Sequence, residues 1–117
     1  MLYFNLPVYK DSYDLMLLLF KITKTLPREY KFTTGEKIKN EALELIICIY
    51  QATKQQNQDK LNNIENARSH LEIIRLLTRI LKDLNIWSVA TVVQVNTLIE
   101  SISKQLSNWT IHTARVQ

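Results

Sequence analysis

Residues 26–45, LPREYKFTTGEKIKNEALEL, separate two stretches of helical pattern. They contain Gly35, the only glycine of the chain, and Pro27, one of its two prolines. Apolar residues at helical spacing end near Thr25 and resume at Ile38. Because glycine and proline are the strongest local breakers of regular structure, this segment predicts a turn between two helices. We call residues 26–34, which precede the expected start of the second helix, the connector.

The rest of the chain is poor in turn-forming residues. One glycine and two prolines in 117 residues are too few for a strand-rich fold, which needs frequent turns. The length suits one domain. We therefore predict a single all-α domain, an antiparallel up-down-up-down four-helix bundle with helices at about 8–24, 35–55, 61–84 and 88–109. Predicted helix-start signals are Pro7, the pair Thr33 and Glu36, the pair Asn62 and Glu65 or the earlier Asp59, and Ser88. The tail from Thr110 is expected to fray.

Reactive groups are few. The chain has no glycine-rich phosphate loop, nucleophile elbow, Cys-His zinc spacing or Glu-x-x-His motif. Its single cysteine, Cys48, lies among isoleucines and is expected to be buried. We predict a protein that is not an enzyme, with no catalytic residue, metal, cofactor or small-molecule substrate. No apolar run reaches the ~18 residues of a membrane span, and no signal peptide is evident, so we expect a cytoplasmic protein.

The predicted third helix carries a stripe of cations that lie within about 60° of one another around the helix. They are Arg68, Arg75, Arg79 and Lys82. One interpretation is a solvated face, paired through i±3 and i±4 contacts with Glu65, Glu72 and Asp83. The other is a site for a polyanion or an acidic partner, because the guanidinium fork suits phosphate and carboxylate groups. The net charge of +4 does not decide between them.

The connector and the helix start after it form a second basic group. Its cations are Arg28, Lys31, Lys37 and Lys39. Tyr30 and Phe32 between them could stack on bases or attach the connector to the core, and the second role is the safer interpretation. We expect this group at one end of the bundle and hypothesise that it continues the stripe.

The predicted helices 35–55 and 61–84 carry more apolar surface than one bundle seam requires, and the predicted helix 8–24 has two leucines on its polar face. Their surplus apolar residues predict an interface with further copies of the chain. These residues are Leu17, Leu18, Leu43, Ile47, Tyr50, Ile73, Leu76 and Ile80.

Several segments together resemble a known bacterial family of four-helix bundles. The segments are 26–32, 35–39, 41–44, 67–68, 75–79, 82–84 and 107–109, within a likeness covering roughly residues 8 to 110. That family includes the accessory variability determinant of diversity-generating retroelements and the proteins encoded in intervening sequences of 23S ribosomal RNA genes. The two branches are not separated by this sequence.

The resemblance implies a homo-oligomeric ring of five bundles with a basic surface. In the retroelement branch it implies a non-catalytic protein that binds RNA or DNA and the reverse transcriptase, and supports mutagenic synthesis of complementary DNA from the template RNA. The alternative, from the ribosomal branch, is an oligomeric protein-interaction module that does not bind nucleic acid.

Overall fold

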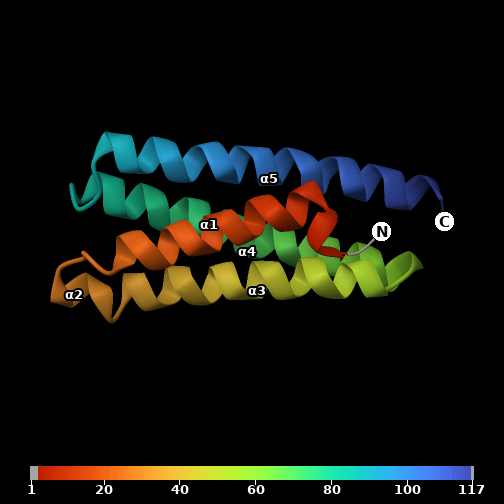
Figure 1. Ribbon diagram of the computed structural model, residues 1–117, viewed down its shortest axis with the longest axis horizontal. Coiled ribbons are helices and arrows are strands. Elements are labelled where there is room, and N and C mark those ends of the chain that lie inside the picture. Colours follow the sequence, from red (N-terminus) through yellow and green to blue (C-terminus); the bar gives the residue numbers. More distant parts are fainter. Residues whose placement is uncertain (1–2, 117) are drawn as a thin grey trace.

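Four long helices pack side by side and antiparallel in the computed structural model, which describes residues 3–116 (Figure 1). A short 3-10 helix, η1 (Tyr3–Asn5), precedes α1 (Pro7–Thr23), and a one-turn helix, α2 (Arg28–Lys31), lies in the connector. The other long helices are α3 (Thr34–Lys54), α4 (Asn57–Asp83) and α5 (Val89–Arg115). Helix α3 packs against α1 and α4, and α5 packs against the other sides of the same two helices. The predicted all-α fold is therefore confirmed.

The predicted limits of the two later helices are wrong. Helix α4 begins four residues before the predicted position 61, because the chain reverses over Gln55 and Gln56 with Asn57 in the left-handed region at φ 56°. The predicted caps at Asp59 and Asn62 are therefore wrong, because both residues lie inside the helix. Helix α5 continues six residues beyond the predicted end at 109. The expected fraying tail is instead helical because it packs against the bundle, where Thr113 is buried and the Thr110 hydroxyl donates to the Leu106 carbonyl. The first and second predicted helices begin and end within one residue of α1 and α3.

The connector is held by close packing around Gly35. This glycine is the second residue of α3, and its φ is not positive. A Cβ there would lie 3.0 Å from Leu26 Cδ1 and 3.2 Å from the Tyr30 carbonyl oxygen. A side chain at this position would therefore force Leu26 and the Tyr30 backbone to shift, so glycine suits the close approach of the connector to α3 and is not needed for a turn conformation.

The predicted helix-start signals have mixed outcomes. Pro7 opens α1, and the Ser88 hydroxyl accepts a hydrogen bond from the Thr91 amide at 3.2 Å, as predicted. The predicted cap of Thr33 and Glu36 is wrong, because the Thr33 hydroxyl donates to the Glu29 carbonyl at 2.8 Å and caps nothing. The connector helix α2 uses the hydroxyl that the sequence pattern had assigned to α3.

The core consists of aliphatic residues from all four long helices. Cys48 is buried among them, and burial, with Glu44 nearby, raises the pKa of its thiol. No helix within residues 3–116 has an uncharged apolar stretch long enough to cross a bilayer. The largest fully buried side chains are Leu15, Leu19, Ile38, Leu45, Ile49, Ile64, Leu71, Ile74, Leu81, Ile99, Ile102 and Leu106.

Candidate nucleic-acid interface

A groove between α4 and α5 brings together three of the four stripe cations. Arg75, Arg79 and Lys82 line it from α4, and Asn96 and Glu100 line it from α5. The groove encloses about 500 Å³. We call it the α4–α5 groove.

Arg68, the fourth stripe cation, lies further along α4. It lines a separate surface depression with Glu65, Ser69 and Glu72. Only three of the four cations therefore share the α4–α5 groove.

The arginines of the stripe are paired with carboxylates. Arg75 Nε lies 3.1 Å from Glu72 Oε2, and its Nη1 donates to Glu100 of α5. The hydrogen bond with Glu100 raises the pKa of Arg75; burial opposes this, and Glu72 reinforces it. Arg79 lies 3.6 Å from Asp83, which makes Lys82 the groove cation with no carboxylate within 4 Å among the described residues.

Arg68 is paired as well, since its Nε lies 3.9 Å from a Glu65 oxygen. The ion pairs expected of a solvated face are therefore present. Exposed pairs of this kind contribute only about 0–1 kcal/mol, so a phosphate group can displace the carboxylates at small cost.

The cations of the second basic group, in the connector and the first turns of α3, are only partly paired. Lys37 Nζ lies 2.9 Å from Glu41, and Lys39 Nζ lies 2.8 Å from Glu36 and 5.5 Å from the centre of the Phe20 ring. Arg28 and Lys31, on α2, have no carboxylate within 4 Å in the described part of the chain. Within this second basic group, the described side chains without a carboxylate partner are thus those of the one-turn helix α2.

The two basic groups lie at the same end of the bundle. Helix α2 and the turn between α4 and α5 are both at the left of Figure 1. However, α2 joins α1 to α3, whereas the groove runs between α4 and α5. The second basic group and the stripe can form one surface only across this end of the bundle. That they do so stays a prediction.

A charged cluster between α3 and α4 was not predicted. Glu41 is buried, and its carboxylate lies 2.9 Å from Lys37 Nζ and 2.5 Å from His70 Nδ1. Burial raises the pKa of Glu41, but the hydrogen bonds from Lys37 and His70 lower it more, so the net shift is downward. The Lys37–Glu41 spacing is visible in the sequence as an i, i+4 pair. The His70 contact is not, because it depends on the register of α4 against α3.

Replacing Glu41 with Gln is expected to lower the free energy of unfolding by about 1–2 kcal/mol at pH 7, because charge-assisted hydrogen bonds to Lys37 and His70 are lost. A carboxylate whose pKa is lower in the folded protein stabilises it above the unfolded-state pKa. The difference between parent and variant should therefore hold above about pH 4.5, the ordinary value, and shrink as the pH falls below it. Urea unfolding at several pH values measures it.

Glu44→Gln is the matched control for this prediction. Glu44 is exposed on the same helix and has no ion pair among the described residues. Equal losses of stability in the two variants, or a parent–variant difference that grows below pH 4, would show that the buried cluster does not stabilise the fold.

The predicted interface residues are divided between two surfaces. Leu17 of α1 (50% exposed) and Leu43, Ile47 and Tyr50 of α3 lie on adjacent helices. The Tyr3 ring links the two helices, because it lies 5.1 Å from the Tyr9 ring of α1 and 4.8 Å from the Tyr50 ring of α3. We call this surface the α1–α3 face. Leu18 is half-buried against the core.

The second surface is on α4. Leu76 is 57% exposed, Ile80 is exposed, and Ile73 is half-buried. Leu76 comes two positions after the buried Ile74, and Ile80 comes two positions after the buried Thr78. Two positions correspond to about 200° around a helix. This surface, the α4 face, therefore points away from the core.

No group of three or more His, Cys, Asp or Glu side chains placed to hold a metal ion occurs in residues 3–116. Comparison with curated proteins gives no significant match. A family model does match: its description is bAvd-like, and it covers residues 8–113, nearly the whole bundle. The chain therefore belongs to the bAvd-like family, the bacterial accessory variability determinants.

Proposed function

We propose that this chain is the accessory protein of a diversity-generating retroelement. In this role it binds template RNA or complementary DNA and the reverse transcriptase, in the cytoplasm, and catalyses no reaction itself. The observation that carries the proposal is the family match across residues 8–113. The α4–α5 groove supports it, because Arg75, Arg79 and Lys82 offer closely spaced donors to successive phosphates.

The working form is a ring of identical subunits, which we take to be a pentamer. A ring needs two different surfaces on each subunit, because each contact joins one patch to another and the rotation closes on itself. The α1–α3 face and the α4 face are two such surfaces. Large apolar side chains are exposed on each: Leu17 and Ile47 on the α1–α3 face, and Leu76 on the α4 face. A bundle that works as a monomer does not require this much exposed apolar surface.

Ring assembly also strengthens the case for nucleic-acid binding. One subunit has a net charge of +4, and three stripe arginines are already paired with carboxylates. Affinity for nucleic acid rises with the number of phosphates neutralised, so repeated grooves bind far more tightly than one. Binding is expected to weaken with salt and to tolerate changes of sequence.

Glu100→Gln is expected to increase affinity for single-stranded RNA about threefold to tenfold. The change removes the α5 carboxylate that competes for Arg75 and adds one unit of positive charge beside the groove. Fluorescence anisotropy of a labelled oligonucleotide measures the affinity. Asp14→Asn on α1 adds the same charge away from the groove, at an exposed residue with no ion pair among the described residues, and should change affinity less. Equal gains would assign the effect to net charge alone.

A second candidate function is an oligomeric protein-interaction module that does not bind nucleic acid, as in the ribosomal intervening-sequence branch. The ion pairs of Arg68, Arg75 and Arg79 favour it, since they satisfy these arginines within the chain. A gel-shift assay against single-stranded RNA at low and moderate salt separates the candidates. A shift that weakens with salt supports the retroelement role, and no shift at low salt supports the module.

The reverse-transcriptase partnership has its own test. A reverse-transcriptase gene and a template/variable repeat pair are expected beside the gene for this chain. That reverse transcriptase, combined with the chain and the template RNA, should make more complementary DNA than it does without the chain. A ribosomal RNA gene around the coding sequence, or synthesis that does not change, would contradict the partnership.

A further inference from the structure

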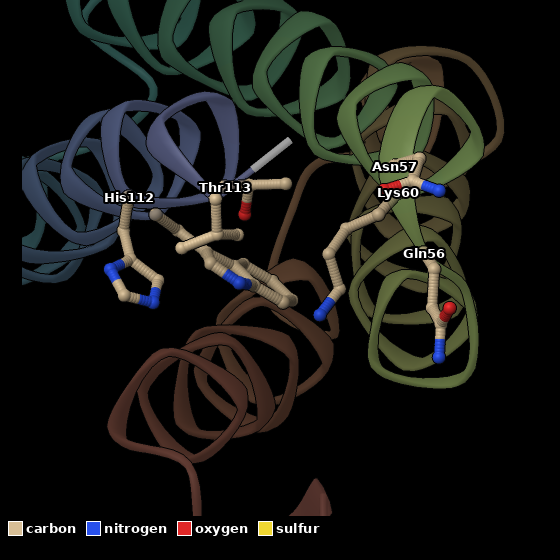
Figure 2. Close-up of a pocket in the computed structure, with 7 residues that line it drawn as sticks. Gln56, Asn57, Lys60, His112 and Thr113 are labelled. Carbon is tan, nitrogen blue, oxygen red and sulfur yellow. The ribbon is translucent and has the colours of Figure 1, made fainter.

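A pocket opens at the end of the bundle opposite α2, where the turn between α3 and α4 meets the end of α5 (Figure 2). It has a volume of about 230 Å³. We call it the end pocket. The side chains that form most of its wall are Gln56, Asn57, Lys60, Trp109, His112 and Thr113.

The end pocket combines an aromatic surface with an uncompensated cation. Lys60 Nζ lies 5.7 Å from the centre of the Trp109 ring. Figure 2 shows the Lys60 side chain reaching from α4 into the space before α5, with His112 on the far side. No carboxylate lines the pocket, and Lys60 has none within 4 Å in the part of the chain that the structure describes. An anion can therefore bind here without displacing a carboxylate, unlike at Arg75.

The size of the end pocket limits its ligand. Sites for drug-sized molecules enclose about 300–1,000 Å³, so this pocket fits one flat ring system better than a larger molecule. An aromatic ring beside a cation is the arrangement that single-stranded nucleic-acid binding proteins use, because a base stacks on the ring while the cation holds the backbone. An acidic peptide would use Lys60 but would leave the Trp109 ring without a flat partner.

We propose that the end pocket takes one unstacked nucleobase of a single-stranded nucleic acid, with the base against Trp109 and the adjoining phosphate on Lys60. This inference rests on the proposed function, because it assumes that the chain binds nucleic acid. It adds a separate site at the other end of the bundle from α2. A strand bound there and in the α4–α5 groove would follow the length of the molecule, whose longest extent is 47 Å.

Tryptophan fluorescence tests the proposal directly. The chain has two tryptophans, Trp87 and Trp109. Trp87 is buried, and its indole nitrogen has no hydrogen-bond partner among residues 3–116. Trp87→Phe therefore loses no hydrogen bond seen there and leaves Trp109 as the reporter. This variant is titrated with oligouridylate of about 10 nucleotides, with polyphosphate, and with an RNA duplex. Saturable quenching by oligouridylate, and little by the other two, is the expected result.

Substitutions within the pocket provide the second measurement. We expect both Lys60→Gln and Trp109→Leu to weaken oligouridylate binding about tenfold. Trp109→Leu should leave polyphosphate binding nearly unchanged, because the cation at Lys60 is kept. Lys104→Gln is the control, because Lys104 is exposed on α5 and does not line the pocket. If Trp109→Leu proves unstable by circular dichroism, Lys60→Gln still decides, because the Lys60 side chain makes no hydrogen bond or ion pair among the described residues.

The measurements distinguish a failure of the end-pocket proposal from a failure of the proposed function. Oligouridylate that binds with unchanged Trp109 emission, and with equal affinity in parent and Lys60→Gln, overturns the end pocket and leaves the proposed function standing. Equal quenching by polyphosphate shows a general anion site and overturns the nucleobase assignment. No binding of any single-stranded oligonucleotide at low salt overturns both.

Discussion

Replacing both Arg75 and Arg79 with Glu is expected to lower affinity for single-stranded RNA at least about 100-fold at low salt. A charge-assisted hydrogen bond contributes about 1.5–3 kcal/mol, so two lost contacts account for this factor, and the new carboxylates repel phosphate. The plot of log affinity against log salt should also become shallower by about one for each lost contact. Fluorescence anisotropy over a range of salt concentrations measures both quantities.

The matched control is the pair Lys10→Glu and Lys21→Glu. Both lysines are exposed on α1, which packs against α3 and α5, and the charge change is the same as in the arginine pair. The control should lose far less affinity. Because Arg75 pairs with Glu72 and Glu100, circular dichroism must show that its replacement leaves the helices intact. A folded arginine variant that binds like the control would remove the α4–α5 groove from the nucleic-acid interface.

Replacing Leu76 and Ile80 with Asp is expected to convert the ring into monomers. Both side chains are exposed in the single subunit, so the change should cost the isolated fold little. In the ring the same positions would bury charges without partners, at a cost of several kcal/mol for each contact. Light scattering coupled to size-exclusion chromatography should give about five times the mass of one chain for the parent and about one chain mass for the variant.

Val89 and Val93 provide the control for ring assembly. They are 70% and 57% exposed on α5, outside both proposed interface surfaces. Their replacement with Asp should leave the oligomer unchanged. A parent that is monomeric at micromolar concentration would contradict the ring itself. An oligomer that persists in the Leu76 and Ile80 variant would exclude the α4 face from the contact.

Much of the fold could be predicted from the sequence because local rules decide it. Ile38, where the apolar spacing resumes, is buried on the inner side of α3 together with Leu45 and Ile49, since apolar periodicity alone identifies the inner side of a helix. Pro7 and Ser88 mark their helix starts for equally local reasons. The scarcity of glycine and proline was enough to exclude a sheet.

Features that depend on contacts between distant segments could not be predicted. The hydroxyl of Thr33 bonds back to Glu29 because the connector forms α2. The Tyr30 carbonyl of α2 lies close to Gly35 of α3, a contact that the sequence does not show. The Glu41–His70 contact depends on the register of α4 against α3. Tertiary packing overrides local propensity in both cases.

The candidate site shows the same division. The stripe of Arg75, Arg79 and Lys82 follows from helical spacing, and its neighbours Glu72 and Asp83 are within reach on the same helix. Glu100 belongs to another helix, and only the bundle places it against Arg75. The end pocket was missed because the last turns of α5 were expected to fray.

Binding of a labelled single-stranded RNA as a function of salt is the most direct test of whether the chain binds nucleic acid through phosphate contacts. The parent chain, at a concentration where it is oligomeric, is titrated into the RNA between about 50 and 200 mM salt. Binding is expected at the lowest salt, with log affinity falling linearly against log salt and a slope that corresponds to several phosphate contacts. No binding at about 50 mM salt, or an affinity that does not change with salt, would contradict it.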